Sequence, residues 1–323
     1  MTKAKVIVTR RWPEAVERTL ADEYELVLNE SDTPMTAEQL QAAFAEADAV
    51  CPTVSDKITE AVMSPPTLRA KVIGNYGVGF NHIDLEAAKA RDLVVTNTPE
   101  VLTDCTADTA MTLMLMAARR AGEGERHVRT KAWTGWRPTH MMGTKVTGKV
   151  LGLVGFGRIA RAMAHKAHFG FGMQIRYFDP YPPADEVANA YGAIRCDSID
   201  EVMASADFVS LHMPGGGANT GIINSEKLAL MKPGAYLINT ARGDVVDEAA
   251  LTAALRDGVI AGAGLDVYEK EPTVTEALLS MDNVVLLPHL GSATLETREA
   301  MGMRVVDNLR AFFAGKPPRD RVA

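Results

Sequence analysis

Three side chains that could together bind and protonate a small anion follow three apolar runs in the second half of the chain. Arg242 stands in NTARG, Glu271 in DVYEKEP and His289 in LLPHLGS. A guanidinium can hold a carboxylate and a neighbouring carbonyl, an imidazolium can protonate a carbonyl oxygen, and a carboxylate can orient that imidazole. The three residues therefore predict acid–base chemistry on a small 2-oxo acid.

A glycine-rich turn predicts a dinucleotide site. The apolar run 150–154 leads into Gly155-Phe156-Gly157-Arg158-Ile159-Ala160 and then a helical pattern. Such a turn lets the backbone approach a pyrophosphate and places that anion at a helix N-terminus. Asp179 ends the next apolar run, where a carboxylate can accept hydrogen bonds from both hydroxyls of an adenosine ribose. A glycine-rich turn with a capping aspartate is the alternative, but the pairing of turn and carboxylate favours the cofactor.

The charge of Asp179 predicts NAD rather than NADP. Pro180, Tyr181, Pro182 and Pro183 follow it, so a 2′-phosphate there would meet a carboxylate with no Arg or Lys directly after it.

Taken singly, Arg242 could be a surface ion-pair residue, Glu271 a solvated loop residue and His289 an ordinary loop histidine. Their joint occurrence behind a dinucleotide-binding pattern favours catalysis. No metal site is predicted, because the remaining histidines and the three cysteines lack metal-ligand spacing.

Apolar runs alternate with helical patterns along most of the chain. Five runs lie near Val6, Leu26, Val50, Ile73 and Val95, and six more are VLGLVGFG, QIRYFDP, DFVSLHMP, AYLINTARG, GAGLDVYE and VVLLPH. This rhythm predicts α/β architecture with parallel sheets. A long helix is expected over 103–125 as a domain connector, and a final helix from Thr294 before GKPPRDRVA, which reads as a tail.

Composition limits the function classes. At 323 residues and 47% hydrophobic content, the chain suggests about two domains. A net charge of -7 disfavours nucleic acid and anionic membranes as partners. The N-terminus lacks the apolar core of a signal peptide, and three separated cysteines do not suggest a disulfide framework. We expect a cytoplasmic protein.

Several segments resemble signatures of the D-isomer-specific 2-hydroxyacid dehydrogenase family. They are GFGRIA, NTARGDVVDE, GLDVYEKEP and PHLGSAT, and the likeness covers nearly the whole chain. The segments VLTDCTAD, ARRAGEGE and AWTGWRP most resemble the glyoxylate/hydroxypyruvate reductase, or D-glycerate dehydrogenase, branch. The resemblance implies that Arg242 binds substrate, that His289 is the acid/base and that Glu271 is its partner.

The resemblance also implies binding residues. Backbone N–H groups of Val78 and Gly79 would hold the substrate carboxylate. The expected cofactor-binding residues are Thr106, Gly155, Gly157, Arg158, Ile159, Asp179, His212, Pro214, Thr240, Asp266 and Gly291. One departure concerns the loop after LHMP, where GGGANT replaces a family loop such as LTPET, so that Asn219 or Thr220 would have to supply any phosphate contact.

Pattern and resemblance together predict two doubly wound parallel-sheet domains, a Rossmann NAD-binding domain (99–291) inserted in a flavodoxin-like substrate domain (1–98 plus 292–323). The expected activity is NADH-dependent reduction of hydroxypyruvate to D-glycerate, of glyoxylate to glycolate, or both. The alternatives are another D-2-hydroxyacid dehydrogenase of the D-lactate or phosphoglycerate type, formate or phosphonate oxidation, and a catalytically silent NAD-sensing protein. A homodimer is expected, through the helix 109–120 and the loop 133–138, in which Trp133 and Trp136 lie.

Overall fold

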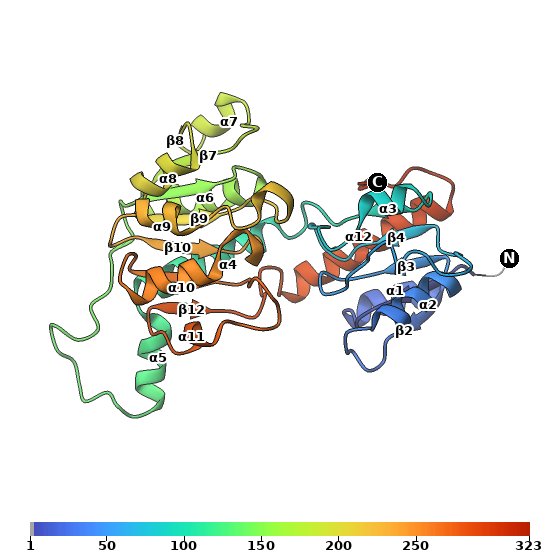
Figure 1. Ribbon diagram of the computed structural model, residues 1–323, viewed down its shortest axis with the longest axis horizontal. Helices are drawn as coiled ribbons and strands as arrows, with labels where there is room; N and C mark the ends of the chain where they lie inside the picture. The colour runs from blue at the N-terminus through green and yellow to red at the C-terminus, as the bar shows by residue number, and fades with distance from the viewer. Residues whose placement is uncertain (1–2) are drawn as a thin grey trace. The chain divides into compact units, whose positions relative to one another are not determined.

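The computed structural model of the protein describes residues 3–323 and separates into two compact units (Figure 1). Unit 1 contains the chain up to Leu102 together with Ala293–Ala323, and unit 2 is Thr103–Ser292. Each unit is built on one parallel sheet. The expected α/β class with two parallel-sheet domains is confirmed.

Unit 1 has the strand order of flavodoxin-like folds, β2-β1-β3-β4-β5. Its strands are β1 (Lys5–Val8), β2 (Glu25–Leu28), β3 (Ala49–Cys51), β4 (Val72–Gly74) and β5 (Val94–Thr96), and its helices are α1 (Glu14–Glu23), α2 (Ala37–Glu46), α3 (Leu85–Lys89) and α12 (Leu295–Phe313). Residues of α1 and α12 share one hydrophobic core, and residues of α2 and α3 share another. The sheet is therefore covered on both faces, and its inner strands β1, β3 and β4 are nearly all buried and apolar, whereas the edge strand β2 is partly exposed.

Unit 2 has the order β12-β11-β10-β9-β6-β7-β8, the doubly wound Rossmann arrangement with one further strand. Its strands are β6 (Val150–Val154), β7 (Gln174–Phe178), β8 (Ala193–Arg195), β9 (Phe208–Leu211), β10 (Tyr236–Asn239), β11 (Gly262–Leu265) and β12 (Val284–Leu286). Its helices are α4 (Thr103–Ala118), α5 (Ala121–Arg129), α6 (Arg158–Phe171), α7 (Asp185–Asn189), α8 (Ile199–Ser205), α9 (Ser225–Leu230), α10 (Glu248–Arg256) and α11 (Glu276–Leu279). α4 and α6 cover one face of the sheet, and α8, α9 and α10 cover the other.

The expected helix over 103–125 is wrong in extent and in role. The helix ends at Ala118, and α5 begins only after Arg120, whose backbone is left-handed (φ 53°). The N–H of Thr144 donates to the Ala118 carbonyl (N···O 2.7 Å), taking the acceptor that a continuing helix would give to Gly122. α4 is also no mere connector, because its buried residues pack into the core of unit 2.

Two further details differ from the sequence-based expectation. β8 was not predicted, since only Ala193 of its three residues is buried. The C-terminal segment is no loose tail, because Val322 N–H donates to the Val95 carbonyl (2.8 Å) and Arg321 forms an antiparallel bridge with Thr96. The last residues thus extend the sheet of unit 1 beyond β5.

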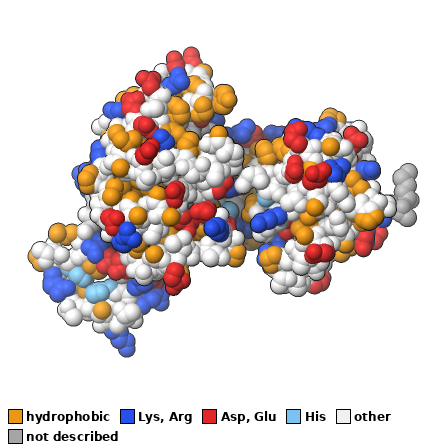
Figure 2. All heavy atoms as spheres, in the orientation of Figure 1, with side chains coloured by type: hydrophobic (Ala, Val, Ile, Leu, Met, Phe, Trp, Pro, Cys, Tyr) orange, Lys and Arg blue, Asp and Glu red, His pale blue; other side chains and the backbone are white. Residues whose placement is uncertain are grey.

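α5 and the segment after it project from unit 2 without joining its core (Figure 1). α5 buries no residue, and its neighbourhood exposes Val128, Trp133, Trp136 and Met142. Figure 2 shows hydrophobic, basic and histidine side chains gathered over this region. We refer to residues 119–142, which precede the return of the chain to the core at Val146, as the arm. Among the residues described, every helix is too short or too polar to span a bilayer.

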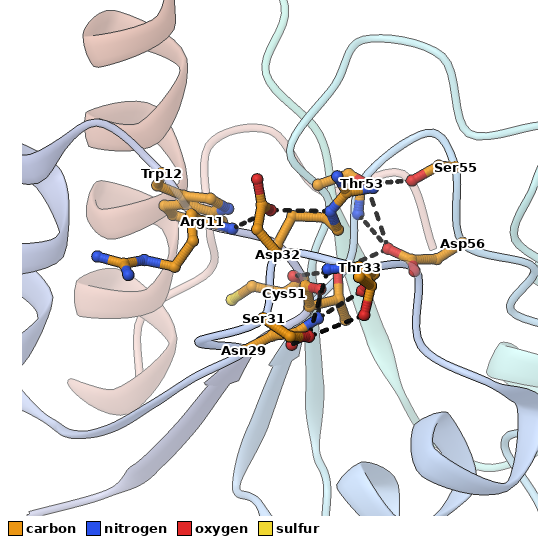
Figure 3. Close-up of polar contacts among 12 residues, drawn as sticks. Arg11, Trp12, Asn29, Ser31, Asp32, Thr33, Cys51, Thr53, Ser55 and Asp56 are labelled. Carbon is orange, nitrogen blue, oxygen red and sulfur yellow. Dashed lines mark hydrogen bonds and ion pairs between the residues drawn. The ribbon is translucent and has the colours of Figure 1, made fainter. Parts of the chain in front are cut away.

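A polar network joins the carboxyl ends of β1, β2 and β3 in unit 1 (Figure 3). Asp56 accepts hydrogen bonds from the Thr9 hydroxyl (2.6 Å) and the Thr53 N–H (2.8 Å), and the Asn29 amide donates to the Thr9 carbonyl (2.8 Å). Thr53 in turn forms a parallel bridge with Tyr76. The network therefore supports the start of the loop that carries Val78.

We predict that Gly74→Ala destabilises the protein by about 1–3 kcal/mol through overpacking. A methyl group there would lie 2.7 Å from Cγ1 of Val305 on α12 and 3.1 Å from Sγ of Cys51. Adding Val305→Ala removes the nearest clashing atom, so the double variant should be less destabilised than the sum of the single variants. Denaturant unfolding measures the cycle, and strictly additive losses would contradict this packing.

Candidate active site

Arg242, Glu271 and His289 lie at the same edge of the unit 2 sheet. They follow β10, β11 and β12, which are adjacent parallel strands. Because parallel strands present their carboxyl ends on one side, loops distant in sequence converge there. The structure therefore brings the predicted trio to one edge.

The imidazole of His289 contacts the Glu271 carboxylate directly. Nδ1 lies 2.8 Å from Oε2, and the two side chains are 32% and 33% exposed. A carboxylate only accepts, so Nδ1 must donate and Nε2 is left to exchange a proton. Burial acts to raise the pKa of Glu271, but the hydrogen bond and charge of His289, the Tyr268 N–H and Arg242 outweigh it and lower that pKa.

Asp266 fixes the backbone of His289. His289 has a left-handed conformation (φ 55°), which a residue with a side chain adopts only where its surroundings enforce it. The Asp266 carbonyl accepts the His289 N–H (2.9 Å), and its carboxylate accepts the N–H groups of Leu290 (2.6 Å) and Gly291 (2.7 Å). Burial raises the pKa of Asp266 despite these donors and the charge of His289. Three hydrogen bonds that Asp266 accepts thus define the turn that presents the imidazole.

The Arg242 guanidinium is set by a tight turn after β10. The Asn239 side chain donates to the Arg242 carbonyl (2.8 Å) and accepts the Ala241 N–H (3.0 Å). Burial lowers the pKa of Arg242, opposed by the charges of Glu271 and Asp244. A partly desolvated guanidinium of this kind binds a carboxylate strongly.

The glycine loop after Pro214 packs onto that turn. A Cβ at Gly215 would lie 2.9 Å from Cβ of Arg242 and 2.3 Å from Oδ1 of Asp244, whose other oxygen accepts the Gly216 N–H (2.7 Å). A side chain at position 215 would therefore clash with the turn of Arg242. The Asn219 amide, a candidate for a phosphate contact, donates to the Pro214 carbonyl (2.9 Å).

The turn after β6 fits the pyrophosphate of a dinucleotide. Gly155 has a positive φ (86°), and a Cβ there would lie 2.8 Å from the His212 carbonyl oxygen. Gly157 precedes α6 without a side-chain cap, and a Cβ on it would meet nothing within 4 Å. The first turn of α6, with Arg158 and Ile159, therefore offers backbone donors to an anion. The residues present fit the cofactor that the sequence predicts.

Asp179 lies beside this turn, at the end of β7. Its carboxylate accepts the N–H groups of Phe156 (2.7 Å) and Tyr181 (2.8 Å). Each carboxylate oxygen has a further lone pair for a ribose hydroxyl. The side chain is thus fixed next to the glycine turn.

The remaining cofactor candidates gather in unit 2. The Thr106 hydroxyl donates to the Gly291 carbonyl (3.0 Å), so these two meet beside Asp266. Within the described residues, the buried Thr240 hydroxyl has no hydrogen-bond partner. His212, two residues before Pro214, has its Nε2 2.9 Å from the Ser210 hydroxyl oxygen. Burial lowers the pKa of His212 to about 3, so the imidazole is neutral.

Val78 and Gly79 belong to unit 1. The amide of Asn75 donates to the carbonyls of Gly77 and Gly79 (both 3.0 Å), and that of Asn97 donates to the Val78 carbonyl (2.8 Å). In the part of the chain described, neither the Val78 nor the Gly79 N–H has an acceptor. Two adjacent N–H groups on a loop held in this way are available to donate to an anion.

Sequence reasoning missed Tyr268 and Glu248. The Tyr268 N–H donates to Oε1 of Glu271 (3.1 Å), and its hydroxyl donates to the Leu287 carbonyl (2.8 Å), two residues before His289. The buried carboxylate of Glu248 accepts from Glu269 and Thr275, on either side of Glu271. No local pattern signals these roles, because each partner lies in another loop.

Comparisons with known proteins agree with this geometry. A family model described as D-isomer specific 2-hydroxyacid dehydrogenase, NAD binding domain, matches residues 111–291. The chain is 43% identical over 321 residues to a glyoxylate reductase of Pyrococcus furiosus, covering 98% of this chain and 94% of that protein. It is 37% identical over 315 residues to a glycerate dehydrogenase of Hyphomicrobium methylovorum, covering 98% of each. It also resembles the structure of an NADPH-dependent glyoxylate/hydroxypyruvate reductase from Sinorhizobium meliloti in complex with NADP and malonate, with a TM-score of 0.88, 35% identity and coverage of 100% and 97%.

Proposed function

The chain belongs to the D-isomer specific 2-hydroxyacid dehydrogenase family, and we propose that it reduces hydroxypyruvate to D-glycerate, glyoxylate to glycolate, or both. Family membership confirms the predicted resemblance and with it an oxidoreductase that uses a nicotinamide dinucleotide. The observation that carries the proposed chemistry is the 2.8 Å contact between Nδ1 of His289 and Oε2 of Glu271. It supports an imidazole with Nε2 directed to a substrate.

In this proposal His289 protonates the substrate carbonyl oxygen from Nε2 and takes the proton back in the reverse reaction. Glu271 keeps its negative charge and stabilises the imidazolium before the transfer. Arg242 binds the carboxylate and the carbonyl oxygen with two N–H groups, and polarises the carbonyl. A bound nicotinamide supplies the hydride that adds to the carbonyl carbon.

The N–H groups of Val78 and Gly79 are proposed to hold the substrate carboxylate, and the α6 N-terminus to hold the pyrophosphate of the cofactor. The lack of acceptors for both N–H groups among the described residues supports the first assignment. The uncapped Gly157 supports the second. Thr106, Thr240, Asp266 and Gly291 are proposed to line the nicotinamide end, on the strength of their gathering near His289.

We predict that His289→Ala lowers kcat for hydroxypyruvate by roughly a hundredfold or more while cofactor binding stays near normal, since the imidazole acts in proton transfer. NADH oxidation followed by absorbance measures turnover, and fluorescence titration measures binding. His168→Ala, a histidine on α6, is the matched control and should keep parent turnover. A His289→Ala enzyme with near-parent turnover would overturn the assignment, and a parent inactive on both acids would overturn the proposed function.

We propose that NADH is preferred over NADPH, with Asp179 as the cause. A relative 35% identical is named as NADPH-dependent, so family membership alone does not select the cofactor. Asp179 is held by two backbone donors beside the glycine turn, and it would face a 2′-phosphate with like charge.

We expect kcat/KM to favour NADH by at least roughly tenfold, because one unfavourable charge contact of about 1.4 kcal/mol gives that ratio. Asp179→Asn keeps the size of the side chain but removes its charge, so the ratio should fall toward one. Initial rates with each cofactor at saturating hydroxypyruvate test this. A parent enzyme that prefers NADPH would remove Asp179 from its role.

We propose that two chains associate through the arm. The helix 109–120, which the sequence predicts in the dimer interface, has little apolar surface to offer, because most apolar side chains of α4 are buried in unit 2. The arm instead exposes Trp136 (82%), Met142 (67%), Val128 (58%) and Trp133 (53%). An apolar group of this kind, flanked by basic residues, is typical of an interface.

We predict a stable dimer at micromolar concentration, and its weakening by Trp136→Asp, which would bury a charge in the interface. Light scattering over a dilution series measures the assembly. Tyr181→Asp, at another exposed aromatic residue of unit 2, is the control and should leave it intact. A monomeric parent would refute the proposal.

A cytoplasmic location is also proposed. Cys51 and Cys196 are buried thiols, and burial raises the pKa of Cys51 to about 12. Thiols kept reduced in the core are common in cytoplasmic proteins.

A further inference from the structure

The loop that carries Glu271 is exposed, whereas Glu248, whose carboxylate accepts hydrogen bonds from that loop, is buried. Glu248, the first residue of α10, is 7% exposed, whereas Glu269, Lys270 and Glu271 are exposed. A buried carboxylate is costly unless donors surround it. The groups that donate hydrogen bonds to Glu248 therefore indicate which part of the structure this buried carboxylate holds in place.

All the loop donors to Glu248 flank Glu271. Oε2 accepts the Glu269 N–H (3.0 Å), and Oε1 accepts the Thr275 N–H (3.2 Å) and the Thr275 hydroxyl. One carboxylate thus closes the loop at both ends. The N-terminal end of α10, where Glu248 lies, further favours a negative charge.

A second contact fixes the loop against the turn of Arg242. A Cβ at Gly243 would lie 1.9 Å from the carbonyl carbon of Tyr268 and 2.5 Å from the Glu269 nitrogen, so the two backbones touch. The Tyr268 N–H then donates to Oε1 of Glu271. The loop is therefore held from its first peptide to Thr275.

Helix capping does not account for Glu248. The N-cap of α10 is Asp247, whose side chain accepts the Ala250 N–H (2.9 Å). The two adjacent carboxylates have different tasks, one within the helix and one in the loop. Asp247 is consequently a matched control for Glu248.

We propose that Glu248 is a positioning residue for the reaction: by holding Glu269 and Thr275 it places the Glu271 carboxylate against Nδ1 of His289 and so orients the imidazole. This inference rests on the proposed function. Glu248 acts through Glu271 alone, and replacing it leaves the cofactor cradle intact. A reacting group displaced by about 1 Å can slow turnover by about a hundredfold.

The first test needs no turnover. Proton NMR at acid pH observes the hydrogen-bonded imidazole N–H of His289, assigned by its absence in His289→Ala. We expect it in the parent and in Asp247→Ala, and its loss in Glu248→Gln, whose amide cannot accept from both ends of the loop. Retention of the resonance in Glu248→Gln would overturn the proposal.

The second test is a kinetic cycle with hydroxypyruvate. Glu248→Gln should lower kcat about tenfold or more, with the KM for the cofactor within about twofold of the parent. The double variant should be no slower than Glu271→Gln, because both changes remove one effect. Losses that multiply would show a general structural role and overturn the proposal.

Asp247→Ala should lose thermal stability but keep parent turnover. If Glu248→Gln does not fold, Thr275→Val removes one donor to Glu248 at nearly constant volume and should weaken both the resonance and kcat. An unchanged resonance would refute the proposed role of Glu248. A parent that reduces neither acid would end the proposed function, while the NMR result would still decide whether Glu248 places Glu271.

Discussion

The contact between Nδ1 of His289 and Oε2 of Glu271 requires two surface loops to meet within 2.8 Å. Loops are ordinarily the least fixed parts of a fold. Here each is held by a carboxylate beneath it, Asp266 under the His289 turn and Glu248 under the Glu271 loop. Charge-assisted bonds to backbone N–H groups are strong and directional. The positions of the two loops are therefore fixed by a residue that follows β11 and by the first residue of α10.

The same combination of burial and fixed hydrogen-bond or charge partners also acts on the ionisation of Asp266 and Arg242. Burial raises the pKa of Asp266 and lowers that of Arg242, so desolvation penalises both ionised forms. Fixed N–H dipoles oppose this penalty at Asp266, and neighbouring carboxylates oppose it at Arg242. Charges held by fixed partners need little rearrangement when a substrate changes its own charge, which is how a prearranged site lowers a barrier.

What could be predicted from sequence was local. The glycine turn and the trio were found because each follows an apolar run, and parallel strands bring such ends together. The end of α4 could not be predicted, because the Thr144 N–H that donates to the Ala118 carbonyl comes from a distant part of the chain. Glu248 was missed for the same reason, as nothing around VDEAAL signals a partner in another loop.

Recognition and selectivity are separable in the proposed reaction. The roles proposed for the N–H groups of Val78 and Gly79 and for the guanidinium of Arg242 concern the carboxylate and carbonyl that every 2-oxo acid shares. The side-chain amides of Asn75 and Asn97 hold the loop of Val78 and Gly79 by donating to its backbone carbonyls. Groups of this kind would not by themselves distinguish one 2-oxo acid from another. A preference for hydroxymethyl over hydrogen must come from side chains around them, and it can change without disturbing the pair of Glu271 and His289.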